Sequence, residues 1–101
     1  MAVVSVSVVP VGTGSTSVSA YVARCQEVLG AREGIEYQLT PMATIIEGDL
    51  ETLLAVVAEL HVVPFEKGAQ RVLTTIMIDD RRDKETTMAG KLESVRRKLG
   101  G

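Results

Sequence analysis

Hydrophobic and polar residues alternate over positions 2–9, with the two-residue period of a β-strand. One face of this strand carries Val4, Val6 and Val8, whereas the other face is mixed and carries Ser5, Ser7 and Val9. Pro10 and Gly12-Thr13-Gly14 end the strand. The next apolar positions are 18, 21, 22, 25, 28 and 29, a helical stripe that Ser15 or Ser17 can cap and that Gly30 or Gly34 ends.

The second half of the chain repeats this order of elements. Residues 36–39 and 42–47 predict two short strands joined by a bend at Thr40-Pro41. A second helical stripe begins at Leu50, with Asp49 as its cap and Pro64 as its end. A long strand from Arg71 to about Asp79 follows, and then a polar turn. The last stripe predicts a C-terminal helix with Met88, Leu92, Val95 and Leu99.

The predicted order is strand, helix, strand, strand, helix, strand and a final helix. Two such strand-helix-strand halves are typical of an α+β ferredoxin-like sandwich, a four-stranded antiparallel sheet with its two main helices on one face. A chain of 101 residues suffices for one such core. We therefore expect residues 1–101 to form a single domain.

The second face of this sheet has no helix of its own in the predicted arrangement. Its side chains come from the first and last strands: Ser5, Ser7, Val9, Leu73, Thr75 and Met77. A surface with this mixture of aliphatic and hydroxyl groups is too apolar to face water. We expect a second subunit to cover it, and the alternative is that the C-terminal helix folds back over it.

Composition limits the possible partners. The net charge is −2 and the pI about 5.4, so the chain lacks the basic character of proteins that bind nucleic acid or anionic membranes. No apolar run reaches the roughly 18 residues that span a bilayer, and the N-terminal residues lack the basic region of a signal peptide. We therefore expect a cytoplasmic protein. RNA binding is also disfavoured, because the first and last strands carry no aromatic side chain on which a base could stack.

The single cysteine and the single histidine both fall on apolar helical stripes. Cys25 has no partner for a disulfide or a thiolate metal cluster, so a buried, inert thiol is predicted rather than a reactive one. For His61 a hydrogen-bonded core position is favoured over a general base, and one histidine without thiolates does not make a zinc site. No metal site and no nucleophile-base pair are expected.

Two of the predicted strands end in acidic residues. Glu47 closes an apolar strand, where a carboxylate needs a partner. That partner is either a cationic ligand, or Arg71, or backbone N–H groups at the start of the second helix. The second group, at positions 79–84, alternates with arginine and lysine, which predicts a solvated turn held by local ion pairs.

The motifs along the chain, taken in order, resemble the YkoF-like thiamine-binding family. They are Pro10-x-Gly12, Ser17-x-Ser19-x-Tyr21-Val22, Tyr37-x-Leu39-Thr40-Pro41-Met42-x-Thr44-x-x-Glu47-Gly48, His61, Gly68-x-x-Arg71-Val72 and Ile78-Asp79-Asp80-Arg81-x-Asp83-Lys84, followed by Lys91 and Ser94-Val95. The resemblance implies ferredoxin-like subunits that pair their sheets into dimers and tetramers. It also implies non-enzymatic binding of thiamine, or of its pyrimidine moiety, in a pocket near a subunit interface.

The same resemblance supplies candidate ligand-binding residues. Those at matching motif positions are Pro10, Gly12, Thr13, Ser17, Thr44 and Glu47, with Tyr37 or Tyr21 as a stacking wall. Glu47 is the natural partner of a positive thiazolium ring, and Arg71 and Asp79 would orient the site or join subunits. Thiamine is the expected ligand, and no further cofactor is expected. Two alternatives stay open: a structural or regulatory homo-oligomer without a dedicated ligand, and a weak enzyme in which His61 acts as a general base near Glu47.

Overall fold

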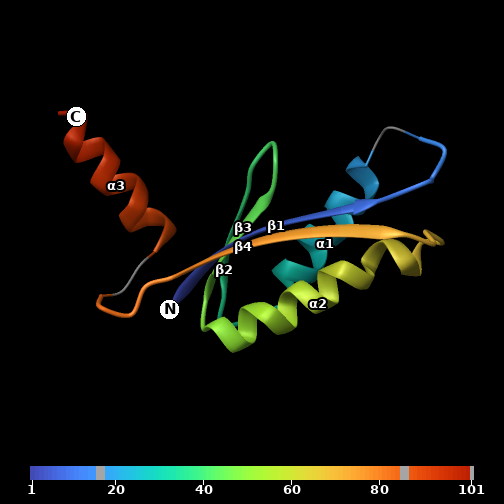
Figure 1. Ribbon diagram of the computed structural model, residues 1–101, viewed down its shortest axis with the longest axis horizontal. Coiled ribbons are helices and arrows are strands. Elements are labelled where there is room, and N and C mark those ends of the chain that lie inside the picture. Colours follow the sequence, from blue (N-terminus) through green and yellow to red (C-terminus); the bar gives the residue numbers. More distant parts are fainter. Residues whose placement is uncertain (16–17, 85–86, 101) are drawn as a thin grey trace.

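The computed structural model describes residues 1–15, 18–84 and 87–100. Along the chain it contains β1 (Ala2–Pro10), α1 (Ser19–Gly30), β2 (Glu36–Leu39), β3 (Thr44–Gly48), α2 (Leu50–Glu66), β4 (Val72–Asp80) and α3 (Met88–Lys98). Figure 1 shows α1 and α2 together beside the sheet, with α3 standing apart beyond one end of it. The predicted order of elements is therefore confirmed.

The four strands form one antiparallel sheet in the order β2-β3-β1-β4. On the central strand β1, Val4 is paired with Ile46 and Ile78, and the next residue towards the N-terminus, Val3, is paired with Glu47 and Asp79. Because directly paired residues point to the same face, this register divides the side chains of the sheet into two sets. The order and the two helices on one face make a ferredoxin-like sandwich, as predicted.

The hydrophobic core lies between the sheet and the helices α1 and α2. It is almost wholly aliphatic, as a chain with three aromatic residues requires. The buried members are Ala2, Val4, Val6, Cys25, Leu29, Ile46, Leu53, Val56, Val57, Leu60 and Val63. The predicted assignment of Val4 and Val6 to the inner face of β1 is confirmed, and the prediction of a buried Cys25 is confirmed as well.

The end of α2 differs from the prediction, because Pro64 lies inside the helix rather than terminating it. Proline lacks an N–H donor but its φ is compatible with a helix, so the helix can continue for a short distance beyond it. The carbonyl of Pro64 accepts the N–H groups of Lys67 and Ala69 at 3.1 and 3.0 Å, which closes the chain after Glu66. Pro64 is consequently buried in the last turn of α2.

The face of the sheet opposite α1 and α2, called here the open face, is only partly covered by α3. The helix begins over β3, where the backbone N–H of Met88 meets Glu47. Further along β4, Leu73 and Met77 are 62% and 71% exposed. Only the start of α3 approaches the open face and none of its described residues is buried, so the alternative that the C-terminal helix folds back over this face is wrong. Within the described ranges, no helix is both long and apolar enough to cross a bilayer.

Candidate ligand-binding site

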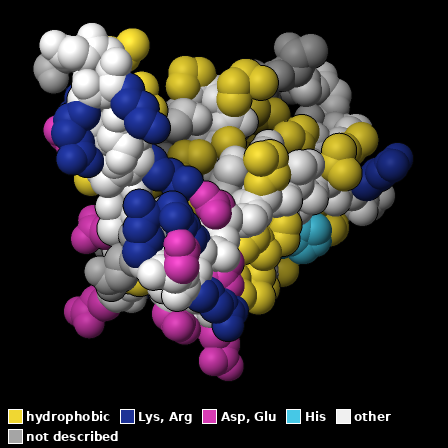
Figure 2. Space-filling view, turned by 60° about the vertical axis from the view of Figure 1, so that its left-hand side comes forward, with side chains coloured by type: hydrophobic (Ala, Val, Ile, Leu, Met, Phe, Trp, Pro, Cys, Tyr) yellow, Lys and Arg dark blue, Asp and Glu magenta, His cyan; other side chains and the backbone are white. Residues whose placement is uncertain are grey.

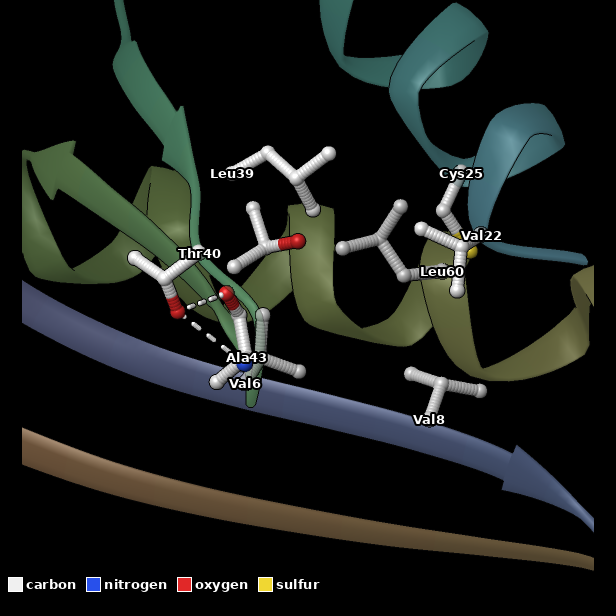
Figure 3. A pocket seen from close by; sticks show the side chains of 9 residues that line it. Val6, Val8, Val22, Cys25, Leu39, Thr40, Ala43 and Leu60 are labelled. Carbon is white, nitrogen blue, oxygen red and sulfur yellow. Dashed lines mark hydrogen bonds between the residues drawn. The ribbon is translucent and has the colours of Figure 1, made fainter. Parts of the chain in front are cut away.

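A cleft of about 60 Å³ opens between α1 and the β2–β3 edge of the sheet. Figure 3 shows its walls: Val22 and Cys25 from α1, Leu39 from β2, and Leu60 from α2. The hydroxyl of Thr44 is also among the lining groups. The cleft is therefore an apolar slot with a small number of polar atoms, which is the usual make-up of a small-molecule site.

Thr44 faces this cleft because it is paired with Val6, whose side chain lies on the helix-covered side of the sheet. Its Oγ1 accepts a hydrogen bond of 3.1 Å from the side-chain amide of Gln26 on α1. Thr44 is only 9% exposed, so this bond satisfies a polar atom that would otherwise be costly to bury. The Thr44 hydroxyl proton can still be donated, and Oε1 of Gln26 can accept.

The other hydroxyl at the cleft belongs to Thr40 and stabilises the turn between β2 and β3. Thr40 donates from Oγ1 to the carbonyl of Ala43 at 2.6 Å and accepts from the N–H of Ala43 at 3.1 Å, both drawn in Figure 3. These bonds close the turn between β2 and β3, where the sequence predicts a bend. Thr44 rather than Thr40 is therefore the hydroxyl available to a ligand.

The thiol of Cys25 forms part of the cleft wall. Burial raises the pKa of this thiol, and the opposing charge of Arg24 lowers it by less. The neutral thiol is accordingly favoured near pH 7, where it acts as a small apolar surface. This agrees with the prediction of an inert rather than a reactive cysteine.

Tyr37 lies on the same side of the sheet as Thr44, since it is paired with Ile46. Its hydroxyl is 3.4 Å from the position that a β-carbon would occupy on Gly30, at the end of α1. The side chain is 41% exposed. It lies two residues before Leu39, on the same face of β2, and outside the cleft. Tyr37 is thus near this site, and Tyr21 lines a different pocket.

Glu47 points to the open face and is separated from the cleft by the sheet. It is 8% exposed, and its Oε2 accepts the backbone N–H of Met88 at 2.6 Å. A backbone partner at a helix start was one of the sequence-based alternatives, but the helix is α3 rather than α2. Arg71 is not the partner within the chain, because it lies at the opposite end of β4, where its carbonyl accepts from Val11 at 2.8 Å.

A groove of about 230 Å³ lies beside Glu47, between the open face and α3. Its walls are mainly apolar, with Val3 and Ile45 from the sheet and Met88 and Leu92 from α3. Lys91 contributes the one charged group among the described lining residues, and it is ion-paired with Asp79. The groove offers apolar surface next to Glu47, and its one described cation is already paired with Asp79.

Pro10, Gly12 and Thr13 occupy a third place, at the far end of β1. Gly12 has φ of 77°, a left-handed conformation that favours glycine. The hydroxyl of Thr13 donates to the carbonyl of Ser15 at 3.2 Å. Ser17, also predicted to bind ligand, lies outside the described residues. The predicted site residues therefore divide among three places in one chain, and only Thr44 lines the cleft.

His61 lies on the helix-covered side of the sheet, away from Glu47. Its Nδ1 is 2.7 Å from Oγ1 of Thr74, and its ring meets Phe65 edge-on with centroids 5.7 Å apart. The predicted hydrogen bond of His61 is confirmed, but the side chain is half-buried rather than a member of the core. Because the sheet separates His61 from Glu47, the two do not form an acid-base pair within the chain.

The charged turn after β4 is held by local pairs, as predicted. Arg82 donates to Asp80 at 2.8 Å and Arg81 donates to Asp83 at 2.5 and 2.8 Å, while Lys91 is paired with Asp79. Figure 2 shows acidic and basic side chains intermingled at the end of the molecule that carries α3. The acids are largely neutralised by their neighbours and do not gather around Glu47.

Comparison with known proteins identifies relatives along nearly the whole chain. UPF0045 protein YqgV of Bacillus subtilis is 52% identical over 98% of this chain and 98% of its own length. The crystal structure of a hypothetical protein from Methanocaldococcus jannaschii superposes with a TM-score of 0.83 at 35% identity, covering 93% of this chain and 94% of that one. A candidate thiamine biosynthesis/salvage protein from Thermotoga maritima gives a TM-score of 0.74 at 26% identity, covering 93% and 97% of the two chains.

The family model described as "Thiamine-binding protein" matches residues 4–96. This range includes β1 through most of α3, so it contains the cleft, Glu47 and the far end of β1. With relatives at 52% identity over the full length, the sequence-based assignment is confirmed. The chain belongs to the thiamine-binding protein family.

Proposed function

We propose that this chain binds thiamine, or its pyrimidine moiety, without transforming it, in the cleft between α1 and the β2–β3 edge. The observation that carries the proposal is the hydrogen bond between Gln26 and Thr44 at the edge of an apolar slot. Membership of the thiamine-binding protein family supports the identity of the ligand.

The chemistry of an aminopyrimidine suits this pair of side chains. The exocyclic amine donates hydrogen bonds and the adjacent ring nitrogen accepts one, so the ring edge needs an acceptor next to a donor. The hydroxyl of Thr44 lines the cleft and can supply the donor. Gln26 lies behind the lining residues, bonded to Thr44, and we assign its Oε1 as the neighbouring acceptor. Val22 and Leu39 supply apolar surface for the ring.

The cleft is small for the whole of thiamine. At about 60 Å³ it is well below the roughly 300–1,000 Å³ of sites that enclose drug-sized ligands. The pyrimidine edge therefore enters and the thiazolium ring stays at the rim, close to Tyr37. Glu47 faces the other side of the sheet, so its carboxylate reaches a thiazolium held here only from a second copy of the chain. Pro10, Gly12 and Thr13 also lie away from the cleft, so they too reach a ligand held there only from a second copy of the chain.

Isothermal titration calorimetry with thiamine tests the proposal. We expect Thr44→Val and Gln26→Leu each to weaken binding at least about tenfold, because each removes a hydrogen-bonding partner of the ring edge. Thr75→Val, the same substitution on the open face, is the matched control and should bind as the wild type does. Loss of binding in Glu47→Gln with normal binding in Thr44→Val would move the site to the groove beside α3. No heat from a folded wild type would reject thiamine binding itself.

We also propose that the exposed part of the open face is covered by a second copy of the chain. Leu73 and Met77 are more than half exposed on this face, and Val9 is 38% exposed beside Leu73. A strip of aliphatic side chains on a sheet is a typical subunit contact. The strip also supports the alternative that the chain is a structural homo-oligomer, in which case assembly is independent of thiamine.

Light scattering measures this association. The double variant Leu73→Glu, Met77→Glu should be monomeric under conditions in which the wild type is larger, since it buries two charges in the contact. Met42→Glu is a suitable control, because Met42 is 87% exposed in the β2–β3 turn rather than on the open face. An unchanged mass for the double variant would exclude the open face as the contact.

A further inference from the structure

A pocket of about 480 Å³ lies at the far end of the sheet, between the β1–α1 loop and the α2–β4 loop. Tyr21, Lys67, Gln70 and Arg71 line it together with Gly12 and other loop residues. We propose that this end pocket binds the phosphate group of a small phosphate monoester. The site is separate from the α1 cleft, and the proposal goes beyond thiamine binding.

The charge of the end pocket is positive and uncompensated. Lys67 and Arg71 both line it, and of the described lining residues none is acidic. Five other cations, Arg24, Arg32, Arg81, Arg82 and Lys91, each pair with a carboxylate. Among the described residues, Lys67 and Arg71 form no such pair. In a chain of net charge −2, two unpaired cations at one concavity favour an anionic ligand.

A backbone hydrogen bond joins the two loops that border the end pocket. The N–H of Val11 donates to the carbonyl of Arg71 at 2.8 Å, which fastens one loop to the other. Gly12 and Gly68 have φ of 77° and 95°, and the positions of their missing β-carbons meet open space. The two glycines therefore leave room for a ligand beside the backbone.

The donor set matches a phosphate better than a carboxylate. A guanidinium forms two parallel hydrogen bonds to a phosphate, and a lysine supplies a second charge for the second negative charge of the dianion. A single carboxylate carries one charge and would leave one cation unmatched. The Gln70 amide and the Tyr21 hydroxyl are further donors at the wall. The volume lies in the range of small-molecule sites, so the ester's organic part also fits.

A second basic groove lies between the turn after β4 and α3. It is larger, about 670 Å³, and includes Arg81, Lys84, Lys91 and Arg97. Two of these cations already have partners, because Arg81 pairs with Asp83 and Lys91 with Asp79. Asp79 itself lines this groove, so an anion there would meet a carboxylate, whereas none of the described lining residues of the end pocket is acidic.

Titration with inorganic phosphate and glycerol phosphate, at constant ionic strength, tests the proposal by calorimetry and by amide NMR shifts. Both ligands should shift the amides of Gly12 and Gly68, and neutral glycerol should not. Arg71→Gln and Lys67→Gln should each weaken binding at least about tenfold. Lys84→Gln, which removes an equal charge outside the pocket, is the matched control.

Several outcomes would overturn the assignment. They are an absence of shifts at Gly12 and Gly68, acetate binding as tightly as phosphate, or an effect of Lys84→Gln as large as that of Arg71→Gln. Thr44→Val should leave phosphate binding unchanged, so a failure here is distinguishable from a failure of the thiamine site. Arg71 contacts Val11 through its backbone, so a side-chain substitution leaves that loop contact in place.

Discussion

Oε2 of Glu47 accepts the backbone N–H of Met88 at 2.6 Å, and so ties the end of β3 to the first residue of α3. The carboxylate is 8% exposed and lies where the helix dipole is positive. Thr87 completes the cap, since its Oγ1 accepts the N–H of Gly90 at 2.9 Å. Glu47, at the end of a strand, thus caps a helix whose first residue lies 41 positions later in the chain.

Replacing Glu47 with alanine should loosen α3 while leaving the sheet folded. The substitution removes a charged acceptor from a helix N-terminus, a loss of about 1–2 kcal/mol. Hydrogen exchange of the amides at the start of α3 should become faster by a corresponding factor. Glu47→Gln should have a smaller effect, because its amide oxygen can still accept. Glu93→Gln, within α3 itself, is the control, and equal protection in Glu47→Ala and the wild type would contradict the capping role.

Replacing Thr74 with valine should lower the free energy of unfolding by about 1 kcal/mol, since it removes the partner of His61 Nδ1. Urea denaturation measures the change. The neighbouring Thr75→Val is a matched control, because Thr75 points to the open face and is exposed. Thiamine binding should be the same in both variants. If Thr74→Val lost more free energy of thiamine binding than free energy of unfolding, His61 would take part in ligand binding, a role that its position does not suggest.

The fold was predictable from the sequence because its signals are local. The alternation of Val4, Val6 and Val8 with Ser5 and Ser7 fixes one face of β1 without knowledge of any other segment. Helix ends were less certain: Pro64 removes one donor, but the last turn tolerates that loss because the Pro64 carbonyl accepts from later N–H groups.

The site was predicted only in part, because its contacts join distant segments. The carboxylate of Glu47 was correctly expected to need a partner, but nothing near it in the sequence identifies Met88 as that partner. Gln26 was missed altogether. It lies directly after Cys25 at the edge of the apolar stripe of α1, where a polar side chain is ordinary, and its bond to Thr44 depends on how α1 crosses the sheet.

Replacing Arg82 with glutamine should raise the pKa of Asp80 towards its ordinary value of 3.8. The hydrogen bond from Arg82 is the main cause that lowers the Asp80 pKa. A lowered pKa stabilises the fold above the ordinary value, and that contribution is lost as the pH falls through the folded-state pKa. NMR titration of the carboxyl carbons measures the shift. Asp83 is the internal control, because Arg81 lowers its pKa independently; a parallel shift of Asp83 would show that the pairs are not local.

Labelling of Cys25 should report on the α1 cleft. Burial raises the pKa of the thiol above its ordinary 9.0, so the folded chain holds less thiolate at pH 8 than the unfolded chain does. Alkylation by iodoacetamide should therefore be slower in the native protein than in urea. Thiamine should slow it further, because Cys25 forms a wall of the cleft. In Thr44→Val, with the ligand site weakened, this protection should disappear at the same thiamine concentration. Protection that persists in Thr44→Val would mean that thiamine shields the thiol from elsewhere.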